Sequence, residues 1–376
     1  MNDVEKKLSS VNWDFTDAPT NNGIHAIHPY PAKFIPQIPA KLIELFRENS
    51  SSVVLDPFCG CGTTLVEAQR FGLDTIGVDL HPLACLISRV KVNPLPDGLI
   101  ETGKKVSITA REKYSGNSVI IPIIPRLDHW FKADIQKALA SIVSQIQSES
   151  IFADALKLAL SSIIVRVSNQ ESDTRYAAIE KDVCAGDVFL LFDRAVKNVA
   201  NAVYALRSNL FYPLGNAKVI NKDTLRLTTE DLPSNIGLVI TSPPYPNAYE
   251  YWLYHKYRMY WLGMDPIQVR KYEIGARPNY FRVNPQNEYD FEKQMEITFG
   301  LLSKVMNKNA KACFIVGRSV LHGRVIDNVS ILERAANLHG FITEGMVLRH
   351  IAKTRKTFNP ENSKINEEHI VVFSCK

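Results

Sequence analysis

The chain has 376 residues, of which 45% are apolar and 22% charged, with a formal net charge of +5. This composition excludes disordered, collagen-like and low-complexity chains, and the small positive charge permits a nucleic-acid partner without requiring one. Apolar runs such as Val119–Ile124 are too short or too interrupted to cross a membrane. The amino-terminal sequence MNDVEKKLSS lacks the features of a signal peptide, which predicts a cytoplasmic protein.

Six short apolar segments, most of them rich in β-branched residues, predict strands, and helical patterns separate several of them. This alternation predicts an α/β fold with a doubly wound, Rossmann-like sheet. The predicted strands, in chain order, are Val53–Leu55, Asp74–Val78, Ala217–Ile220, Ile236–Ile240, Ala312–Val316 and Glu368–Ser374. Helices are predicted over Thr63–Phe71 and Tyr249–Leu262, each following a strand.

A different pattern separates the second and third predicted strands. Lys132–Gln147, Phe152–Val167 and Arg194–Arg207 repeat apolar residues at intervals of three and four, which is typical of helices. We therefore expect residues 1–98 and 216–376 to form one α/β domain and residues 99–215 to form a mostly helical insertion.

The segment VVLDPFCGCGTTLVEA, at Val53–Ala68, predicts a strand, an acid at its end, a glycine-rich turn and a helix. Gly60 and Gly62 would let the backbone turn tightly and approach a ligand, and the following helix offers free N–H groups. A cofactor is expected here. Neither the phosphate-binding sequence with Gly-Lys-Ser/Thr nor a complete GxGxxG is present, which disfavours a nucleoside triphosphate or a dinucleotide.

Two further acids follow predicted strands. Asp79 ends the second strand, 23 residues after Asp56, where doubly wound folds hold an acid that binds ribose hydroxyls. Asp223 follows the third strand, and its carboxylate could accept a hydrogen bond from an adenine amino group. Each acid alone could equally be a turn former or a helix cap.

The segment TSPPYPNAYEYW starts at Thr241, directly after the fourth strand. Pro243 and Pro244 fix the backbone and remove two donors, so the Ser242 hydroxyl and nearby carbonyls could accept hydrogen bonds from an amino group. Tyr245 adds an aromatic face on which a base could stack.

Together these motifs resemble the amino-methylating DNA methyltransferases, which alkylate exocyclic amino groups with S-adenosylmethionine. DPFCGCGTT resembles the glycine-rich cofactor loop of that family, and SPPY resembles its catalytic tetrapeptide. HPYPAKFIPQIPAKLI, at His28–Ile43, resembles a segment that closes over the methionine part of the cofactor in one branch. Serine at the first tetrapeptide position is mostly associated with cytosine-N4 methylation in this family, and aspartate with adenine-N6 methylation.

The resemblance implies an S-adenosylmethionine-dependent methyltransferase fold and direct methyl transfer to a cytosine flipped out of double-stranded DNA. It assigns target recognition to the insertion, with the residues after the tetrapeptide as the alternative place. It also suggests the modification part of a restriction-modification system, with a restriction endonuclease acting separately. The catalytic residues expected are Ser242, Pro243, Pro244 and Tyr245. The cofactor residues expected are Tyr30, Lys33, Phe34, Asp56, Phe58, Gly60, Gly62, Thr63, Thr64, Asp79, Leu80 and Asp223.

Basic residues near the carboxyl terminus and in the insertion are the candidate DNA contacts, on phosphates or base edges. A solvated basic face is the alternative for most of them. The candidates are Arg166, Arg175, Arg349, Lys353, Arg355 and Lys356. No metal site is expected, because the six cysteines form no CxxC pair and no cluster with zinc spacing.

The alternatives are an adenine-N6 DNA methyltransferase, an RNA base methyltransferase and a non-catalytic DNA-binding subunit that retains a cofactor fold.

Overall fold

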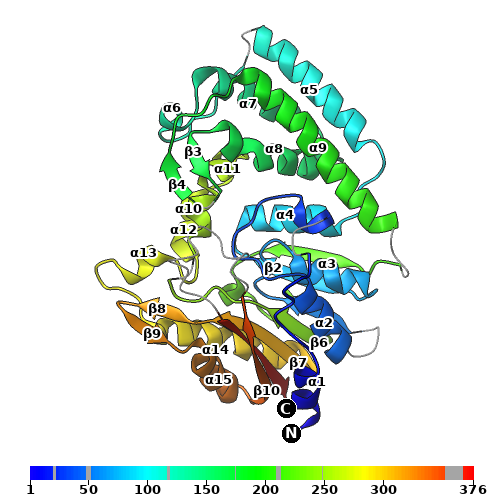
Figure 1. The fold of residues 1–376 in the computed structure, drawn as a ribbon, viewed down its shortest axis with the longest axis vertical. Coiled ribbons are helices and arrows are strands. Elements are labelled where there is room, and N and C mark those ends of the chain that lie inside the picture. Colours follow the sequence, from blue (N-terminus) through cyan, green and yellow to red (C-terminus); the bar gives the residue numbers. More distant parts are fainter. Residues whose placement is uncertain are drawn as a thin grey trace.

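The lower half of the molecule in Figure 1 is built on a seven-stranded sheet. This computed structural model describes residues 1–19, 23–47, 52–116, 119–173, 175–208, 213–247, 249–351 and 367–376. The strands are β1 (Val53–Asp56), β2 (Thr75–Asp79), β5 (Ala217–Asn221), β6 (Ile236–Thr241), β7 (Met306–Gly317), β10 (Phe341–His350) and β11 (Glu367–Cys375). Their order across the sheet is β10-β11-β7-β6-β1-β2-β5.

All neighbouring strands from β5 to β7 pair in parallel, whereas β11 lies antiparallel between β7 and β10. The prediction of a doubly wound α/β sheet is confirmed, and each of the six predicted strands is present. β10 was not predicted. It is an edge strand with many exposed side chains, and an irregular register near Gly345 interrupts its alternation, so its sequence lacks the apolar run of a buried strand.

Helices cover both faces of the sheet because successive side chains of each strand point to opposite sides. Val54 packs with α1 (Asp3–Ser9) and α2 (Gln37–Phe46), on the same face as α3 (Thr63–Arg70). Leu55 packs on the other face, with α14 (Glu288–Val305) and α15 (Asn328–Leu338). We call this second cluster the α14–α15 core.

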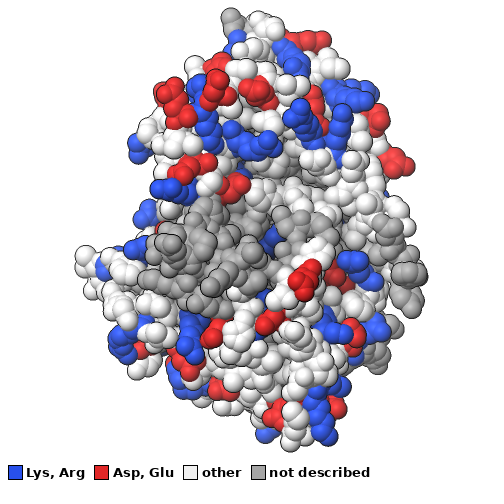
Figure 2. Space-filling model, in the orientation of Figure 1, with Lys and Arg blue, Asp and Glu red and all other residues white. Residues whose placement is uncertain are grey.

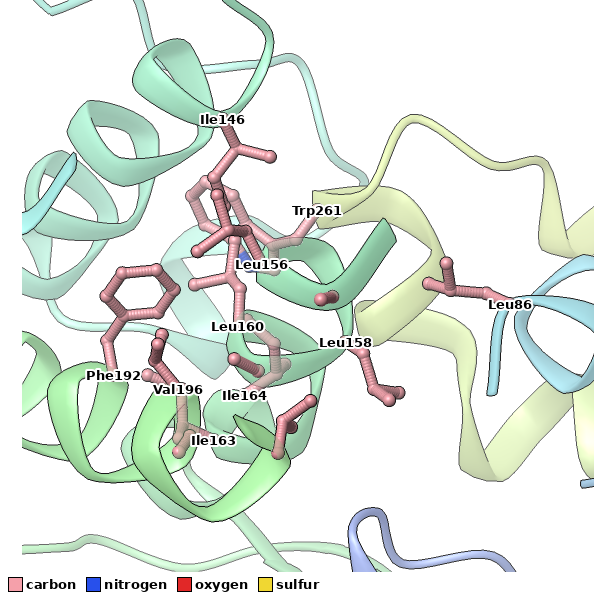
Figure 3. Packing of buried hydrophobic residues seen from close by; sticks show 14 of the residues in the cluster. Leu86, Ile146, Leu156, Leu158, Leu160, Ile163, Ile164, Phe192, Val196 and Trp261 are labelled. Atoms are coloured by element: carbon pink, nitrogen blue, oxygen red, sulfur yellow. The ribbon is translucent and has the colours of Figure 1, made fainter. Parts of the chain in front are cut away.

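Helices also form the upper half of Figure 1. They are α4 (Pro82–Val92), α5 (Leu99–Ser115), α6 (Leu127–Trp130), α7 (Ala133–Ile146), α8 (Ala153–Val167) and α9 (Ala185–Ser208), with a hairpin of β3 (Gln170–Ser172) and β4 (Arg175–Ala178). Figure 3 shows that Leu86 of α4 and Trp261 of α11 belong to the same packed cluster as the side chains of α7, α8 and α9. The helical insertion therefore shares its core with helices on either side of it in the sequence.

The segment after β6 joins the two halves. The predicted helix Tyr249–Leu262 is instead two short helices, separated at His255. These helices and the elements after them are α10 (Tyr251–Tyr254), α11 (Lys256–Trp261), α12 (Pro266–Tyr272), α13 (Arg277–Tyr280) and a hairpin of β8 (Ser319–Leu321) and β9 (Arg324–Ile326). Two 3-10 helices, η1 (Gly23–Ala26) and η2 (Thr224–Arg226), complete the described elements. Among the described residues, every helix is too short or too polar to span a bilayer.

Candidate active site

A hollow with an empty volume of about 830 Å³, open to solvent, lies at the carboxyl ends of the parallel strands. Ligands bind outside these ends at the position where the strand order reverses, which here is between β1 and β6. The lining residues are Tyr30, Ala32, Lys33, Phe34, Phe58, Cys59, Gly60, Cys61, Thr63, Asp79, Leu80, His81, Asp223, Thr224, Ser242, Pro244, Tyr251, Val269, Tyr272, Glu273 and Ile274.

The glycine-rich loop turns through two glycines in the left-handed region, Gly60 at φ 48° and Gly62 at φ 76°. A Cβ at Gly62 would lie 2.7 Å from the Ser88 hydroxyl oxygen, so only glycine fits. The Ser88 hydroxyl donates to the Gly60 carbonyl at 2.9 Å, and the buried Lys91 ammonium donates to the Cys61 carbonyl at 2.7 Å. The loop is therefore held from α4. Gly60 lines the hollow, whereas Gly62 begins α3 behind it.

Asp79 connects this loop to the end of β2. Its carboxylate accepts from the backbone N–H of Gly60 at 2.8 Å and from that of His81 at 2.7 Å. Burial raises the pKa of Asp79 to about 6, and the two N–H donors oppose the shift. The carboxylate lies on the wall of the hollow, where it could accept a further hydrogen bond from a ligand hydroxyl.

Asp56 does not line the hollow. It is buried, and its carboxylate accepts from the Thr241 hydroxyl at 2.7 Å and from the Phe58 N–H at 3.1 Å. Burial raises its pKa to about 7. Thr64 is also buried away from the hollow, and its hydroxyl donates to the Ile240 carbonyl at 3.3 Å. Both residues join the glycine-rich segment to the end of β6, so they hold the cofactor loop beside the tetrapeptide.

Asp223 lies at the hollow on the β5 side, as a cap of η2. Its carboxylate accepts from the Leu225 N–H at 3.0 Å and lies 3.5 Å from the Arg226 guanidinium. Part of its charge is therefore already compensated by the protein.

The segment from His25 to Phe34 covers the glycine-rich loop. Tyr30, Lys33 and Phe34 line the hollow, and the Tyr30 ring lies 3.4 Å from the position of a Cβ at Gly60. The Lys33 ammonium donates to the His25 carbonyl at 2.6 Å, and burial lowers the pKa of Lys33.

Tyr30 lies between two other rings. Its ring stacks on Tyr251 with centroids 5.5 Å apart and on His255 with centroids 5.2 Å apart. This stack connects the amino-terminal segment to α10 across the glycine-rich loop.

The tetrapeptide contributes Ser242 and Pro244 to the wall, while Pro243 is buried behind them. Tyr245 does not line the hollow. Its ring packs against the α14–α15 core, and burial raises its pKa well above the usual tyrosine value. The structure thus brings Ser242 together with the cofactor loop but does not bring the Tyr245 ring to the same wall.

Several lining residues were missed from the sequence. Glu273 follows α12 and is buried; its carboxylate accepts from the Tyr251 N–H at 2.8 Å and lies 3.5 Å from the Trp252 backbone nitrogen. Burial raises the pKa of Glu273 to about 8. His81 is also buried, with its pKa lowered to about 4. Its position two residues after Asp79 is a usable sequence signal, whereas residues 269–274 carry none.

The predicted DNA contacts separate into three groups. Arg166 and Arg175 are exposed, and Arg175 pairs with Glu171 at 3.0 Å. Arg349 does not fit the prediction, because it is 3% exposed, pairs with Glu368, and donates to the Trp13 carbonyl at 3.1 Å. Its guanidinium is therefore used within the fold. Lys353, Arg355 and Lys356 lie outside the described residues.

Known proteins resemble this chain as follows. A family model described as DNA methylase matches residues 2–89, which include His28–Ile43 and the glycine-rich loop. The type II methyltransferase M.MvaI of Kocuria varians is 27% identical over 339 residues, covering 82% of this chain and 74% of that protein. M.BsoBI of Geobacillus stearothermophilus, also a type II methyltransferase, is 23% identical over 67% of this chain and 55% of its own length. A TehB-like S-adenosylmethionine-dependent methyltransferase from Corynebacterium glutamicum gives a TM-score of 0.33 at 11% identity, over 90% of this chain and 87% of that chain.

Proposed function

We propose that the chain, a member of the DNA methylases that modify exocyclic amino groups, transfers a methyl group from S-adenosylmethionine to the N4 amino group of a cytosine in DNA. Its fold is that of the S-adenosylmethionine-dependent methyltransferases, and S-adenosylmethionine is its methyl donor. The observation that carries the proposal is that Ser242 and Pro244 share one hollow with Gly60 and Asp79. A base amino group and a cofactor can therefore meet in a single space.

In the proposed reaction, the amino nitrogen of the base forms a bond to the methyl carbon while the carbon–sulfur bond breaks. The bonding electron pair stays on sulfur, which becomes a neutral thioether, and the nitrogen then loses a proton to solvent. The amino lone pair is delocalised into the ring, so the site must favour a pyramidal nitrogen. The Ser242 hydroxyl and the Pro243 carbonyl are the acceptors proposed for the two amino hydrogens.

Acids in this hollow support a cationic ligand. Asp79, Asp223 and Glu273 all line it. A positive sulfonium would be attracted by the carboxylates of Asp79 and Asp223, whereas Glu273, with its pKa raised to about 8, is mostly neutral at neutral pH and supplies a polar group. Asp79 is proposed to bind the ribose hydroxyls and Asp223 the adenine amino group. Tyr30, Lys33, Phe34, Phe58, Thr63 and Leu80 are proposed as the remaining direct cofactor contacts. For Asp56, Gly62 and Thr64 we propose a supporting role, because they lie behind the wall.

Cytosine is preferred over adenine because serine at position 242 is the residue mostly associated with cytosine-N4 methylation in this family. Flipping of the base from the duplex is part of the proposal, since the hollow is a recess that a stacked base could not enter. The proposed catalytic domain comprises residues 1–98 and 216–376, with target recognition by residues 99–215, where Arg166 and Arg175 are exposed. A role in a restriction-modification system is also proposed.

The test is expression in a host that lacks DNA methylation, followed by digestion of its DNA and mass spectrometry of the nucleosides. N4-methylcytosine is expected, and its absence in a Ser242→Ala variant that still binds S-adenosylmethionine would tie the product to this site. N6-methyladenine would contradict the choice of base. If protein that binds S-adenosylmethionine yields neither product, the proposed activity on DNA is contradicted.

A further inference from the structure

Two neighbouring loops beside the active site are rich in arginine and contain no acidic residue. The first comprises residues 275–287 and includes α13; the second comprises residues 318–326 and includes the β8–β9 hairpin. Together they hold Arg277, Arg282, Arg318 and Arg324, all exposed. Figure 2 shows Lys and Arg side chains along the left edge of the lower half, where Figure 1 places α13, β8 and β9. We call these two loops the arginine loops.

Asn247 attaches both arginine loops to the tetrapeptide segment. Asn247, at φ 56°, donates its backbone N–H to the Gly275 carbonyl at 3.0 Å and its side-chain amide to the Val320 carbonyl at 2.8 Å. Asparagine tolerates this left-handed conformation better than most residues do. Gly275, at φ 76°, lies so close that a Cβ there would be 2.5 Å from the Tyr245 carbonyl oxygen. The position of both loops is therefore fixed relative to Ser242.

The tips of the loops also contact each other and expose apolar side chains. The Phe281 ring lies 4.8 Å from the His322 ring, and the Arg277 guanidinium lies 5.3 Å from the Phe281 ring centre. Phe281 is 49% exposed and Val283 is 91% exposed. Exposed apolar side chains cost free energy in water. Because Phe281 and Val283 lie among arginines at the surface, they are not an unfilled part of the hydrophobic core.

Among the residues that the structure describes, Arg324 is the one of these four arginines with an ion pair. Arg324 has a distant ion pair with Glu288, at 3.8 Å, and its side chain is 78% exposed. Exposed pairs of this length contribute little free energy, so Arg324 can exchange Glu288 for another anion at small cost. Arg282 is exposed at the tip of the α13 loop.

We propose that the arginine loops bind the DNA strand that carries the target base, with Arg282 and Arg324 on phosphates and Phe281 and Val283 against the bases next to the flipped one. This proposal rests on the proposed function, since it requires DNA as the substrate. Arginines on phosphates give affinity without sequence preference. Apolar side chains inserted beside a base step lower the cost of unstacking it. The hydrogen bonds of Asn247 would then hold the arginine loops, and with them the DNA strand, in a fixed position relative to the hollow.

The first test measures DNA binding against salt concentration for an Arg282→Ala, Arg324→Ala double variant. Each lost phosphate contact lowers the slope of log K against log salt by about 0.9, so a decrease of about 1.8 is expected, which is roughly 60-fold in affinity at 0.1 M salt. The matched control is Lys304→Ala with Lys308→Ala. It removes the same charge from exposed residues where α14 ends and β7 begins, away from the hollow. This control should keep the wild-type slope.

The second test concerns the apolar side chains. A Phe281→Ala, Val283→Ala variant should keep the salt slope but lose at least tenfold in methylation of duplex DNA, with a smaller loss on single-stranded DNA. Unchanged S-adenosylmethionine binding by calorimetry shows for each variant that the hollow is intact. If the wild type methylates DNA and the arginine variant binds it with the wild-type slope and affinity, the proposal is wrong. If the wild type neither binds nor methylates DNA, the proposed function itself fails.

Discussion

Replacement of Glu273 by glutamine should stabilise the protein at neutral and alkaline pH. Burial raises the pKa of Glu273 from 4.5 to about 8, so the folded state holds a proton that the unfolded state releases near pH 4.5. The contribution of Glu273 to stability must therefore fall as pH rises through the interval from 4.5 to 8. At 1.36 kcal/mol for each pKa unit, the loss reaches about 5 kcal/mol. Glutamine has no charge to bury and can still accept from the Tyr251 N–H.

Urea unfolding of the ligand-free protein between pH 4.5 and 9 measures this difference. The free energy of unfolding of Glu273→Gln should match the wild type near pH 4.5 within about 1 kcal/mol and exceed it by several kcal/mol at pH 8.5. Glu292→Gln is the matched control with opposite sign. Its carboxylate pairs with Arg334 at 2.7 Å, which lowers its pKa, so the variant should be less stable at neutral pH. A Glu273 difference that does not change between pH 5 and 8 would refute the argument.

Three further substitutions test how the site is held. Gly62→Ala should cost about 2 kcal/mol or more and weaken S-adenosylmethionine binding, because φ is 76° and the Ser88 hydroxyl blocks the new Cβ; differential scanning calorimetry and titration with the cofactor would measure both, and wild-type values would contradict it. Tyr245→Ala should lower the melting temperature by removing a ring from the α14–α15 core; unchanged melting with lost methylation would favour base stacking by Tyr245 instead. Arg349→Ala should destabilise the protein by about 3 kcal/mol because Glu368 loses its partner, while the salt dependence of DNA binding stays at the wild-type slope.

The parallel strands could be predicted because both faces of such a sheet are buried. Segments such as Ile236–Thr241 are then apolar at nearly every position and carry a signal that needs no tertiary information. An edge strand need not be buried on both faces, so its residues need not be apolar at nearly every position. Phe341–His350 alternates buried and exposed residues irregularly and contains no long apolar run, although its backbone pairs from end to end with β11.

The prediction that Arg349 contacts DNA was wrong for a similar reason: the surroundings of this residue depend on strand pairing that the local sequence does not show. In the sequence, Arg349 begins a cluster of cations, and clusters of like charge are usually solvated or bind anions. The register of β10 and β11 sets Arg349 directly opposite Glu368, and the chain from Trp13 covers its guanidinium. Neither partner is near Arg349 in the sequence, so only the strand pairing could reveal the ion pair.

In the active site, too, features with a local sequence motif could be predicted and features that depend on distant contacts could not. The glycine-rich loop and the tetrapeptide, which line one hollow, could be picked out because each is a motif of a few consecutive residues after a strand. Asp56 was predicted with them but does not line the hollow. Its hydrogen bond with the Thr241 hydroxyl instead joins the ends of β1 and β6. Glu273 had no local motif at all, and it lies at the hollow where the segment after α12 contacts the tetrapeptide segment, through the hydrogen bond between Asn247 and Gly275 and the close approach of Gly275 to Tyr245. Short motifs thus predict which segments line the hollow, whereas the other groups that set its charge and shape depend on contacts between distant segments.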